Sequence, residues 1–237
     1  AEESDDAWRE GESATFPLAR FEIPGAAEAP LAGEAPEADL EACGVTPKPY
    51  LDPASRLLLS ACGQALAAAK SDAPRKGIAV GTAWGCTETA ARFFEDYIRK
   101  GPRFVRPFLF PHTYSNTAVS QAAMEWSLKG PHANFTTPGT ASGLAFLSAV
   151  AAVREGLADL MVAGGADALS VPRFFAAGPH AAQQPLGEAG AAVALESAVS
   201  ANARGADILG IVRGVALATD AKAAVTAALA RAGLAAG

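Results

Sequence analysis

The strongest constraint on the fold is the alternation of short apolar segments with longer segments of helical spacing along most of the chain. A strand followed by a helix, repeated in this way, is typical of a layered α/β sheet. Glycine and proline mark the boundaries between segments, as at Gly130-Pro131. We therefore expect strands at 77–81, 132–136, 160–163, 191–196 and 208–216.

Helices are expected where apolar residues recur every three or four positions. In the first of them, Asp52 is a candidate N-cap and Pro53 the first helical residue. Residues 1–50 show no such period and are expected to form an irregular cover over the surface of a domain that spans 51–237. The expected helices are 52–70, one within 82–100 that follows a loop, 115–128, 140–156 and 221–234.

Charge and cysteine content argue against several classes of function. The net charge of −6 and the isoelectric point of about 5.1 disfavour nucleic acid and anionic membranes as partners. The 3 cysteines are an odd number without metal-ligand spacing, so we expect no metal site and a reduced, cytoplasmic compartment. No uncharged apolar stretch reaches about 18 residues, and the acidic start lacks the apolar region of a secretory signal, so we expect neither a membrane span nor export.

The segment 130–168 resembles the nucleophile region of the β-ketoacyl synthases. In that family a strand enters a tight turn, Cys-Ala-Ser-Gly opens a buried helix, and a later strand ends in Gly-Gly-Xaa-Asp. Here Ala141-Ser142-Gly143 and Ala163–Asp167 match the last two of these features. Further matches in the family's order are Tyr50–Pro53, Gly81-Thr82, Pro107-Phe108, Phe110-Pro111, Asn116, Gly187-Glu188, Leu195–Ser197 and Arg204–Ala206. The resemblance implies a thiolase-like α/β fold of five layers, αβαβα, in two similar halves, of which this chain carries essentially the N-terminal half.

Two departures from the family pattern bear on function. Thr140 occupies the position of the nucleophilic cysteine. A helix N-terminus stabilises a thiolate, whereas a threonine hydroxyl has a far higher pKa and needs an adjacent general base. The family's two histidines and its lysine are expected in a second half, but after Glu196 this chain has no histidine, and its one lysine is Lys222. We therefore expect no catalytic residue and no condensing activity in this chain on its own.

The favoured hypothesis is a non-catalytic subunit similar to the chain length factor of type II polyketide synthases. Such a subunit pairs with an active ketosynthase, as a heterodimer or heterotetramer, and shapes the tunnel for the growing acyl chain. The resemblance implies no cofactor; the ligand of the complex is a phosphopantetheinyl acyl chain on an acyl carrier protein. A shortened factor of this kind suits polyene-forming, highly reducing systems. Half a thiolase fold also leaves apolar surfaces that a partner must cover.

Two alternatives remain open. In the first, the chain is an acyltransferase or hydrolase in which Thr140 is acylated, with His112 or His132 as the base. In the second, it is a scaffold that docks an acidic carrier protein without chemistry. The basic cluster available for that docking is Arg99, Lys100, Arg103 and Arg106.

Structural roles are expected for several other residues. Gly164-Gly165 is expected to form a tight turn at a strand end, with Asp167 as a polar turn residue. By resemblance, Glu188 supports the active-site loops, Cys86 has no catalytic role, and residues 130–138 form a strand that pairs across a pseudo-twofold axis. The expected supporting residues are Ser142, Gly143, Gly164, Gly165, Asp167 and Glu188.

The family's tunnel wall and partner interface correspond to an aromatic stretch of this chain. The matching segment in the family crosses the dimer interface and lines the neighbour's acyl tunnel. Here the expected tunnel and partner-contact residues are Phe108, Phe110, His112, Thr113, Tyr114, Asn116, Phe135 and Pro138.

Overall fold

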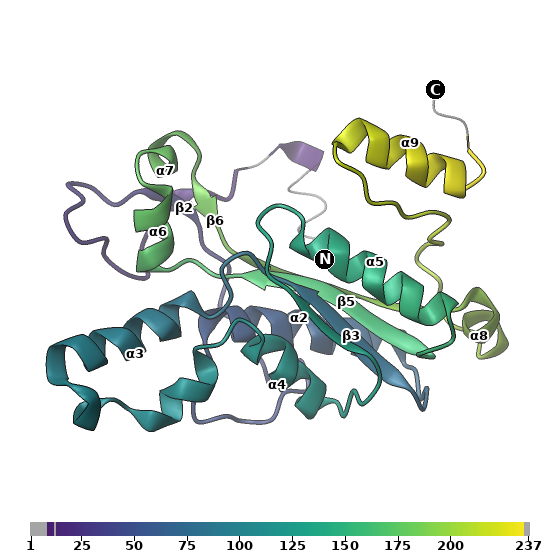
Figure 1. The fold of residues 1–237 in the computed structure, drawn as a ribbon, viewed down its shortest axis with the longest axis horizontal. Helices are drawn as coiled ribbons and strands as arrows, with labels where there is room; N and C mark the ends of the chain where they lie inside the picture. Colours follow the sequence, from purple (N-terminus) through teal and green to yellow (C-terminus); the bar gives the residue numbers. More distant parts are fainter. Residues whose placement is uncertain (1–8, 12, 235–237) are drawn as a thin grey trace.

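A mixed four-stranded sheet in the order β4-β3-β5-β7 forms the centre of the molecule (Figure 1). The computed structural model describes residues 9–11 and 13–234. β3 (Lys76–Gly81), β4 (His132–Phe135) and β5 (Leu160–Asp167) run parallel, and β7 (Ala189–Glu196) runs antiparallel to β5. The α/β class is confirmed, and these strands lie at the first four positions expected from the sequence.

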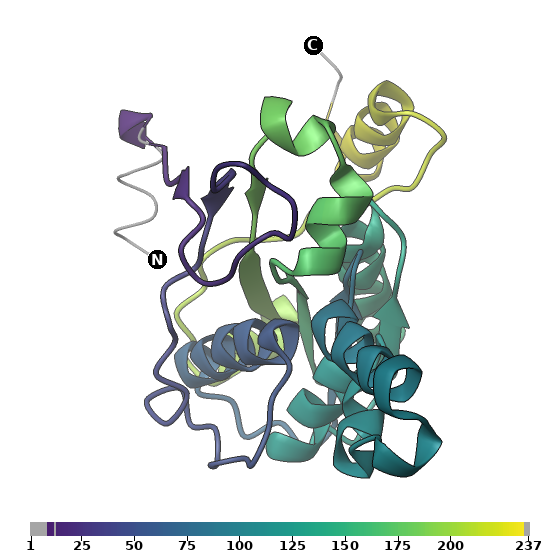
Figure 2. The same cartoon turned by 90° about the vertical axis from the view of Figure 1, so that its left-hand side faces the viewer.

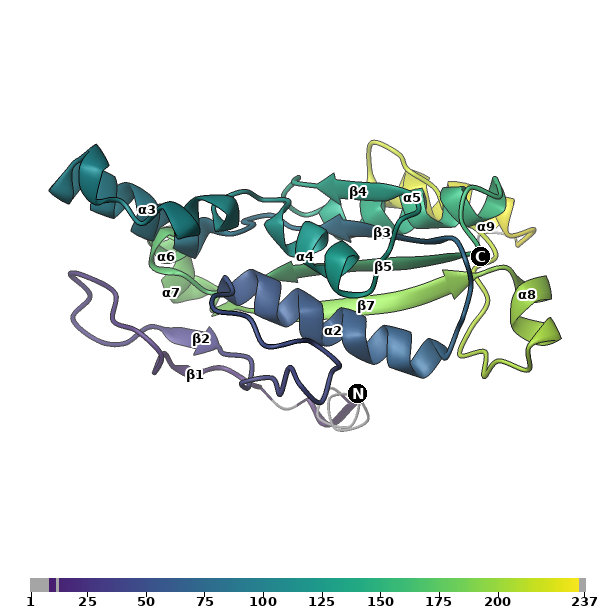
Figure 3. The same cartoon turned by 90° about the horizontal axis from the view of Figure 1, so that it is seen from below.

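Helices cover both faces of this sheet (Figure 1 and Figure 3). One face carries α2 (Pro53–Ala69) and α4 (Thr117–Glu125), and the other carries α5 (Ala141–Arg154). Successive strand residues point to opposite faces. Ile78 and Val80 therefore pack against α2 and α4, while Ala79 packs against α5. The first turn of α2 is as expected, but α4 ends before residue 128, because Ser127 adopts a positive φ of 50°.

Small side chains bring α5 close to the strands. Ala145 and Ala149 of the helix face Ala79 and Ala163 of the sheet, and all four belong to one buried cluster. Alanine adds little thickness between a helix and a sheet, so the backbones can approach closely. Alanines thus form the contact between α5 and the sheet, and this contact positions the start of α5.

After β7, the chain leaves the sheet and crosses over α5. It passes through α8 (Ala198–Ala203) and an extended segment, 206–219, to α9 (Ala221–Arg231), which lies over α5 (Figure 1). The strand expected at 208–216 is wrong: these residues have no regular secondary structure, and Leu209 is 93% exposed. A strand is stabilised by hydrogen bonds to a neighbouring strand, and none of the described strands pairs with this segment.

A second, smaller sheet joins the N-terminal segment to the body of the protein. β1 (Phe16–Pro17) pairs with β2 (Leu31–Gly33), which pairs with β6 (Leu186–Gly187). Figure 2 shows this segment, in purple, beside the green helices α6 (Val171–Ala177) and α7 (His180–Gln183). The described part of the expected cover segment, from residue 13 to 50, therefore lies on the surface but contains two short strands; the boundary at residue 50 stays a prediction.

A projection at one end of the molecule is formed by α3 (Thr87–Lys100) and the 3-10 helices η1 (Pro102–Phe104) and η2 (Pro107–His112), as Figure 3 shows for α3. Asp96 of α3 is buried and accepts hydrogen bonds from Lys100 Nζ at 2.6 Å and Arg106 Nε at 2.8 Å. These two cations hold the pKa of Asp96 below its ordinary value. The ion pairs fix the return of the chain from α3 to η2.

Asp52 caps two helices with one buried carboxylate. Its Oδ1 accepts a hydrogen bond from the amide of Ala54 at 2.9 Å, at the start of α2. Its Oδ2 accepts from the amide of Thr89 at 3.2 Å and from the Thr89 hydroxyl at 2.5 Å, in the first turn of α3. Burial raises the pKa of Asp52, and these hydrogen bonds oppose the rise. The expected N-cap of α2 is confirmed, and the second cap joins α3 to the core.

Glycines allow the start of α5 to touch the strands. A Cβ on Gly81 would lie 2.2 Å from the backbone carbon of Ala141 and 2.2 Å from the backbone nitrogen of Ser142, and one on Gly165 would lie 2.4 Å from Ser142 Oγ. Gly165 and Gly164 both lie inside β5 without a positive φ, so the tight turn expected there is wrong. These glycines are needed for close approach, not for a turn.

We predict that Gly81→Ala destabilises the protein by about 1–3 kcal/mol, because the new methyl group meets backbone atoms that cannot rotate away. Chemical denaturation measures this change in the free energy of unfolding. Gly143→Ala in α5, the helix that Gly81 of β3 contacts, is the control, since a Cβ there meets nothing within 4 Å. Equal stability of the two variants would contradict the proposed contact.

We also predict that Asp52→Ala lowers the free energy of unfolding by about 2 kcal/mol, since one N-cap is worth about 1 kcal/mol and this carboxylate provides two. Asp220→Ala is the control: Asp220 caps only the exposed helix α9, through the amide of Ala223 at 2.8 Å. We expect its loss to cost about 1 kcal/mol or less. A smaller effect at Asp52 than at Asp220 would refute the double cap.

Candidate functional site

The turn between β4 and α5 positions Thr140 at the start of the helix. Pro138 leads into Gly139, which adopts a left-handed φ of 77°. The amide of Ala141 then donates a hydrogen bond to the carbonyl oxygen of Thr137 at 3.0 Å. Because the backbone of Ala141 lies against Gly81, Thr140 is held above the carboxyl end of β3.

The chemistry available to Thr140 is limited by its surroundings. Its side chain is exposed and makes no capping hydrogen bond to α5. A helix N-terminus favours an anion at this point, but its field is far too weak to ionise an alcohol at neutral pH. A nucleophilic threonine would need a base that removes its proton.

The three histidines do not provide that base in the described structure. His112 lies beside Gln121, whose Nε2 is 3.1 Å from His112 Nδ1, and burial lowers the pKa of His112. His132 begins β4, at the end of the strand away from Thr140, and His180 begins α7. Among the described residues, none of these rings hydrogen-bonds to the Thr140 hydroxyl.

Cys86 is also unsuited to act as a nucleophile. Its thiol is 2% exposed and lies 3.9 Å from the hydroxyl of Ser55. Burial, followed by the negative charge of Asp52, raises the pKa of Cys86 to about 12. The reactive thiolate is therefore not populated at neutral pH.

Asp167 anchors the loop that follows β3. Its carboxylate accepts hydrogen bonds from the Thr82 hydroxyl at 2.8 Å, the amide of Ala83 at 3.0 Å and the amide of Trp84 at 2.8 Å. Asp167 is the last residue of β5, so it does not act as the turn residue expected from the sequence. Its contacts tie the neighbouring ends of β3 and β5 together beside the start of α5.

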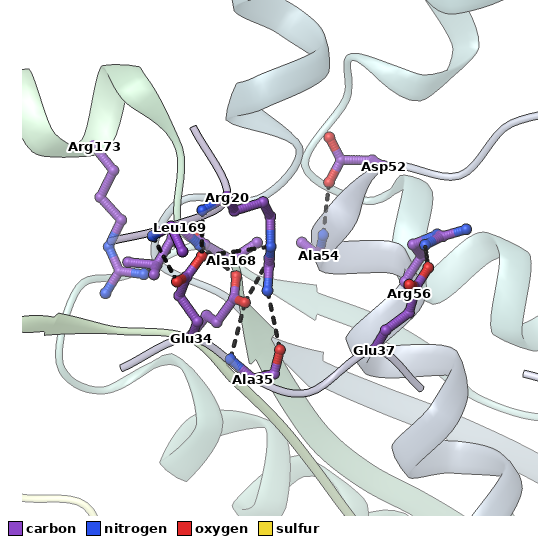
Figure 4. A network of polar contacts seen from close by, with 12 residues as sticks. Arg20, Glu34, Ala35, Glu37, Asp52, Ala54, Arg56, Ala168, Leu169 and Arg173 are labelled. Atoms are coloured by element: carbon purple, nitrogen blue, oxygen red, sulfur yellow. Dashed lines mark hydrogen bonds and ion pairs between the residues drawn. The ribbon is translucent and has the colours of Figure 1, made fainter. Parts of the chain in front are cut away.

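Glu188 joins the N-terminal segment to the loop after β5. Its carboxylate accepts hydrogen bonds from the amide of Ala35 at 3.0 Å and the amide of Leu169 at 2.9 Å. It also pairs with Arg20, whose Nη1 lies 2.6 Å from Glu188 Oε1. Figure 4 shows Arg20, Ala35 and Leu169 gathered at this point together with Glu34, whose Oε1 accepts from the amide of Arg20 at 3.0 Å. The carboxylate of Glu188 thus holds two loops that are distant in the sequence.

The aromatic segment expected to line a tunnel lies on η2 and in the loop after it. Phe108, Phe110 and Tyr114 are 57%, 48% and 51% exposed. Tyr50 packs edge-to-face against Phe108, with ring centroids 6.3 Å apart, and against His112 at 5.2 Å. The segment therefore has exposed aromatic rings, and Tyr50 packs against its residues Phe108 and His112.

The other residues of the expected tunnel group divide between this segment and the turn before α5. Thr113 donates its hydroxyl to the carbonyl oxygen of Phe110 at 2.8 Å, and Asn116 is an exposed residue at the start of α4. Phe135 is partly buried against α5, and Pro138 is exposed in the turn. Of the expected supporting residues, Ser142 and Gly143 lie in the first turn of α5 and Gly165 contacts Ser142, whereas Gly164 faces Ala191 and Ala192 of β7. Asp167 ends β5.

The basic cluster at the end of α3 and in the segment after it is partly neutralised within the chain. Arg99 pairs with Glu95 at 3.0 Å, while Lys100 and Arg106 share Asp96. Arg103 is exposed. Glu95 and Asp96 thus balance half of the charge of the four cations.

Within residues 9–11 and 13–234, no group of three or more histidine, cysteine, aspartate or glutamate side chains is arranged to hold a metal ion. In that same part of the chain, the helices are too short or too polar to span a lipid bilayer.

Three residues of these networks are not among the site residues expected from the sequence. Tyr50 and Thr82 lie in motifs that match the family, and those matches are the signal that could have identified them. Arg20 lies in a segment without periodicity, and its partner Glu188 is far along the chain. Only the fold brings that ion pair together.

Comparison with known proteins agrees with this geometry. The family described as Beta-ketoacyl synthase, N-terminal domain, matches residues 5–184. The 3-oxoacyl-[acyl-carrier-protein] synthase I of Arabidopsis thaliana chloroplasts is 32% identical over 101 residues, which is 43% of this chain and 21% of that protein. The matches to curated relatives span from 21% to 42% of those relatives' own length.

Solved structures share the fold. The ishigamide ketosynthase/chain length factor superposes with a TM-score of 0.83 at 24% identity, over 99% of this chain and 66% of that one. A type II PKS acyl-carrier protein in complex with its ketosynthase, bound to the hexaketide, gives a TM-score of 0.58 at 24% identity over 66% of this chain and 50% of that one. These likenesses confirm the thiolase-like fold of the ketosynthases, with this chain corresponding to the N-terminal half. The family match over most of the chain, together with the strand, turn and helix that carry Thr140, means that this protein belongs to the β-ketoacyl synthase family.

Proposed function

We propose that the chain is a non-catalytic ketosynthase-like subunit, a chain length factor, which pairs with an active ketosynthase in type II polyketide biosynthesis. The observation that carries this proposal is Thr140, which stands where the family has its nucleophilic cysteine. Its hydroxyl has no base within hydrogen-bonding distance among the described residues. Without a nucleophile, the first step of condensation, transfer of the acyl chain to the enzyme, has no acceptor here.

Two structural neighbours support the type II setting. One is by its title a ketosynthase/chain length factor, and the other a type II ketosynthase with its acyl-carrier protein. By analogy, the partners of this chain are an active ketosynthase subunit and an acyl carrier protein. The proposed ligand of the complex is the phosphopantetheinyl acyl chain on that carrier, with no cofactor of the subunit itself. A shared fold does not by itself give a shared activity, whereas the side chain of Thr140 bears directly on the chemistry of this chain.

The proposed contribution of the chain is one wall of the acyl tunnel. Phe108, Phe110 and Tyr114 are roughly half exposed, and Tyr50 and Phe93 support them through ring contacts. Exposed rings on a rigid support are suited to contact an acyl chain or a partner protein. The rings of Phe108 and Phe110 offer no hydrogen-bond donor to keto groups, and Tyr114 offers only its hydroxyl. We propose that this favours an apolar acyl chain, as in highly reducing or polyene systems.

The partner would meet the free side of β4. In the described chain, β4 pairs with β3 on one side only. An edge strand of this kind presents unpaired amide and carbonyl groups to a second polypeptide. The 130–138 region contains this edge strand and leads into the turn with Pro138. We therefore propose that this region contacts the ketosynthase. The three unpaired cysteines fit a cytoplasmic complex.

We predict that Thr140→Ala leaves product formation by the co-expressed pair within twofold of the wild type. Mass spectrometry after incubation with an acyl thioester is expected to detect an adduct on the partner's cysteine and none on Thr140. The acylated partner serves as the positive control for the reagent. An adduct on Thr140 that disappears in Thr140→Ala would instead establish the acyltransferase or hydrolase alternative.

We predict that Phe110→Ala in the co-expressed pair lengthens the product by at least one two-carbon unit, because it removes bulk from the proposed tunnel wall. Product analysis by liquid chromatography and mass spectrometry measures this change. Phe94→Ala is the matched control, since Phe94 is similarly exposed, at 57%, but lies on α3 outside the expected tunnel segment. Unchanged product length with normal turnover in Phe110→Ala would mean that the wall lies elsewhere.

A further inference from the structure

A cavity lies at the end of α5 that is distant from Thr140. Its volume is about 610 Å³. Its walls come from the last turns of α5 and α9 and from the segment 212–215 that runs between these helices. The residues that line it are Val150, Arg154, Val212, Arg213, Gly214, Val215 and Arg231.

This cavity is positively charged in a chain whose net charge is −6. Arg154, Arg213 and Arg231 all line it, and no carboxylate does. Arg154 and Arg231 stand in the last turns of helices, where a cation also stabilises the helix dipole. Arg213 belongs to no helix, so the dipole does not account for the third guanidinium group.

In the described chain, the three arginines that line the cavity have no carboxylate partner. Arg231 Nη1 donates to the carbonyl oxygen of Val215 at 2.6 Å. Among residues 9–11 and 13–234, none of the three forms an ion pair with a carboxylate. Other arginines of the chain do, such as Arg75 with Asp159 at 2.6 Å. The positive charge in the cavity is therefore not balanced by the lining residues.

Arg154, Arg213 and Arg231 are exposed side chains that line one cavity, so an anion bound there would have three guanidinium groups available as partners. The guanidinium fork matches the oxygens of phosphate. Val150 and Val212 form apolar walls, and the volume lies within the range of about 300–1,000 Å³ typical of small-molecule sites. We propose that this cavity binds a small soluble molecule that carries two or more phosphate groups.

Binding there would also fasten α9 to the rest of the protein. No residue of α9 is fully buried, and the helix rests on the 212–215 segment. A Cβ on Gly214 would lie 2.2 Å from the carbonyl oxygen of Ala228, so helix and segment are in direct contact. An anion held between Arg154 of α5 and Arg231 of α9 would bridge the two helices.

The test uses inorganic pyrophosphate as the probe and the full chain, together with any partner that copurifies. Isothermal titration calorimetry is expected to detect binding that sodium chloride at equal ionic strength does not reproduce. Arg213→Ala is expected to weaken binding at least tenfold. Arg103→Ala, which removes an exposed arginine outside the cavity, is the control and is expected to leave the dissociation constant within twofold.

Two further measurements identify the ligand class and the location. Citrate, a polyanion without phosphate, is expected to bind at least tenfold more weakly than pyrophosphate. Hydrogen exchange of residues 206–231 is expected to slow when pyrophosphate is added. The proposal is overturned if there is no binding beyond the chloride control, if both arginine variants lose affinity equally, if citrate binds as well as pyrophosphate, or if exchange is unchanged. None of these readouts depends on product formation, so the result is independent of the proposed function.

Discussion

The contact between the first turn of α5 and the backbones of β3 and β5 determines the geometry of the whole site. It exists because Gly81 and Gly165 lack side chains where Ala141 and Ser142 approach. A methyl group at Gly81 would meet the backbone of the helix and push it away from the sheet, and one at Gly165 would meet the Ser142 hydroxyl and the Gly81 carbonyl oxygen. The helix start, and with it Thr140, would then no longer stand above the carboxyl ends of the strands.

Three carboxylates hold the surrounding loops to this centre. Asp52 caps the start of α2 and binds the first turn of α3. Asp167 holds the loop after β3, and Glu188 joins the N-terminal segment to the loop after β5. Each accepts at least two hydrogen bonds from groups that are distant in sequence or belong to different elements. The hydrogen bonds offset part of the cost of removing a carboxylate from water, although at Asp52 the effect of burial is larger and the pKa stays raised.

The site has the strand, turn and helix start of its family, with a threonine as the residue before α5. The strand, the turn and the helix start remain, but the turn presents a threonine without a hydrogen-bonded base among the described residues. At the same time, the aromatic segment on η2 is rigidly supported and exposed. A protein with this combination is better suited to shape a cavity than to form a covalent intermediate, and that is the basis of the proposed function.

Sequence alone determined the α/β class, the central strands and the N-cap Asp52 of α2, because hydrophobic period and capping residues are local signals. The motif around Thr140, with the matches elsewhere in the chain, likewise indicated the family. The strand expected at 208–216 failed because strand formation depends on a hydrogen-bonding neighbour, which a local pattern cannot supply. The turn expected at Gly164-Gly165 failed because a glycine used for close approach and one used for a turn look the same in sequence. Tertiary structure alone decided the pairing of Arg20 with Glu188 and the meeting of three arginines at one cavity, since these contacts join residues that only folding brings together.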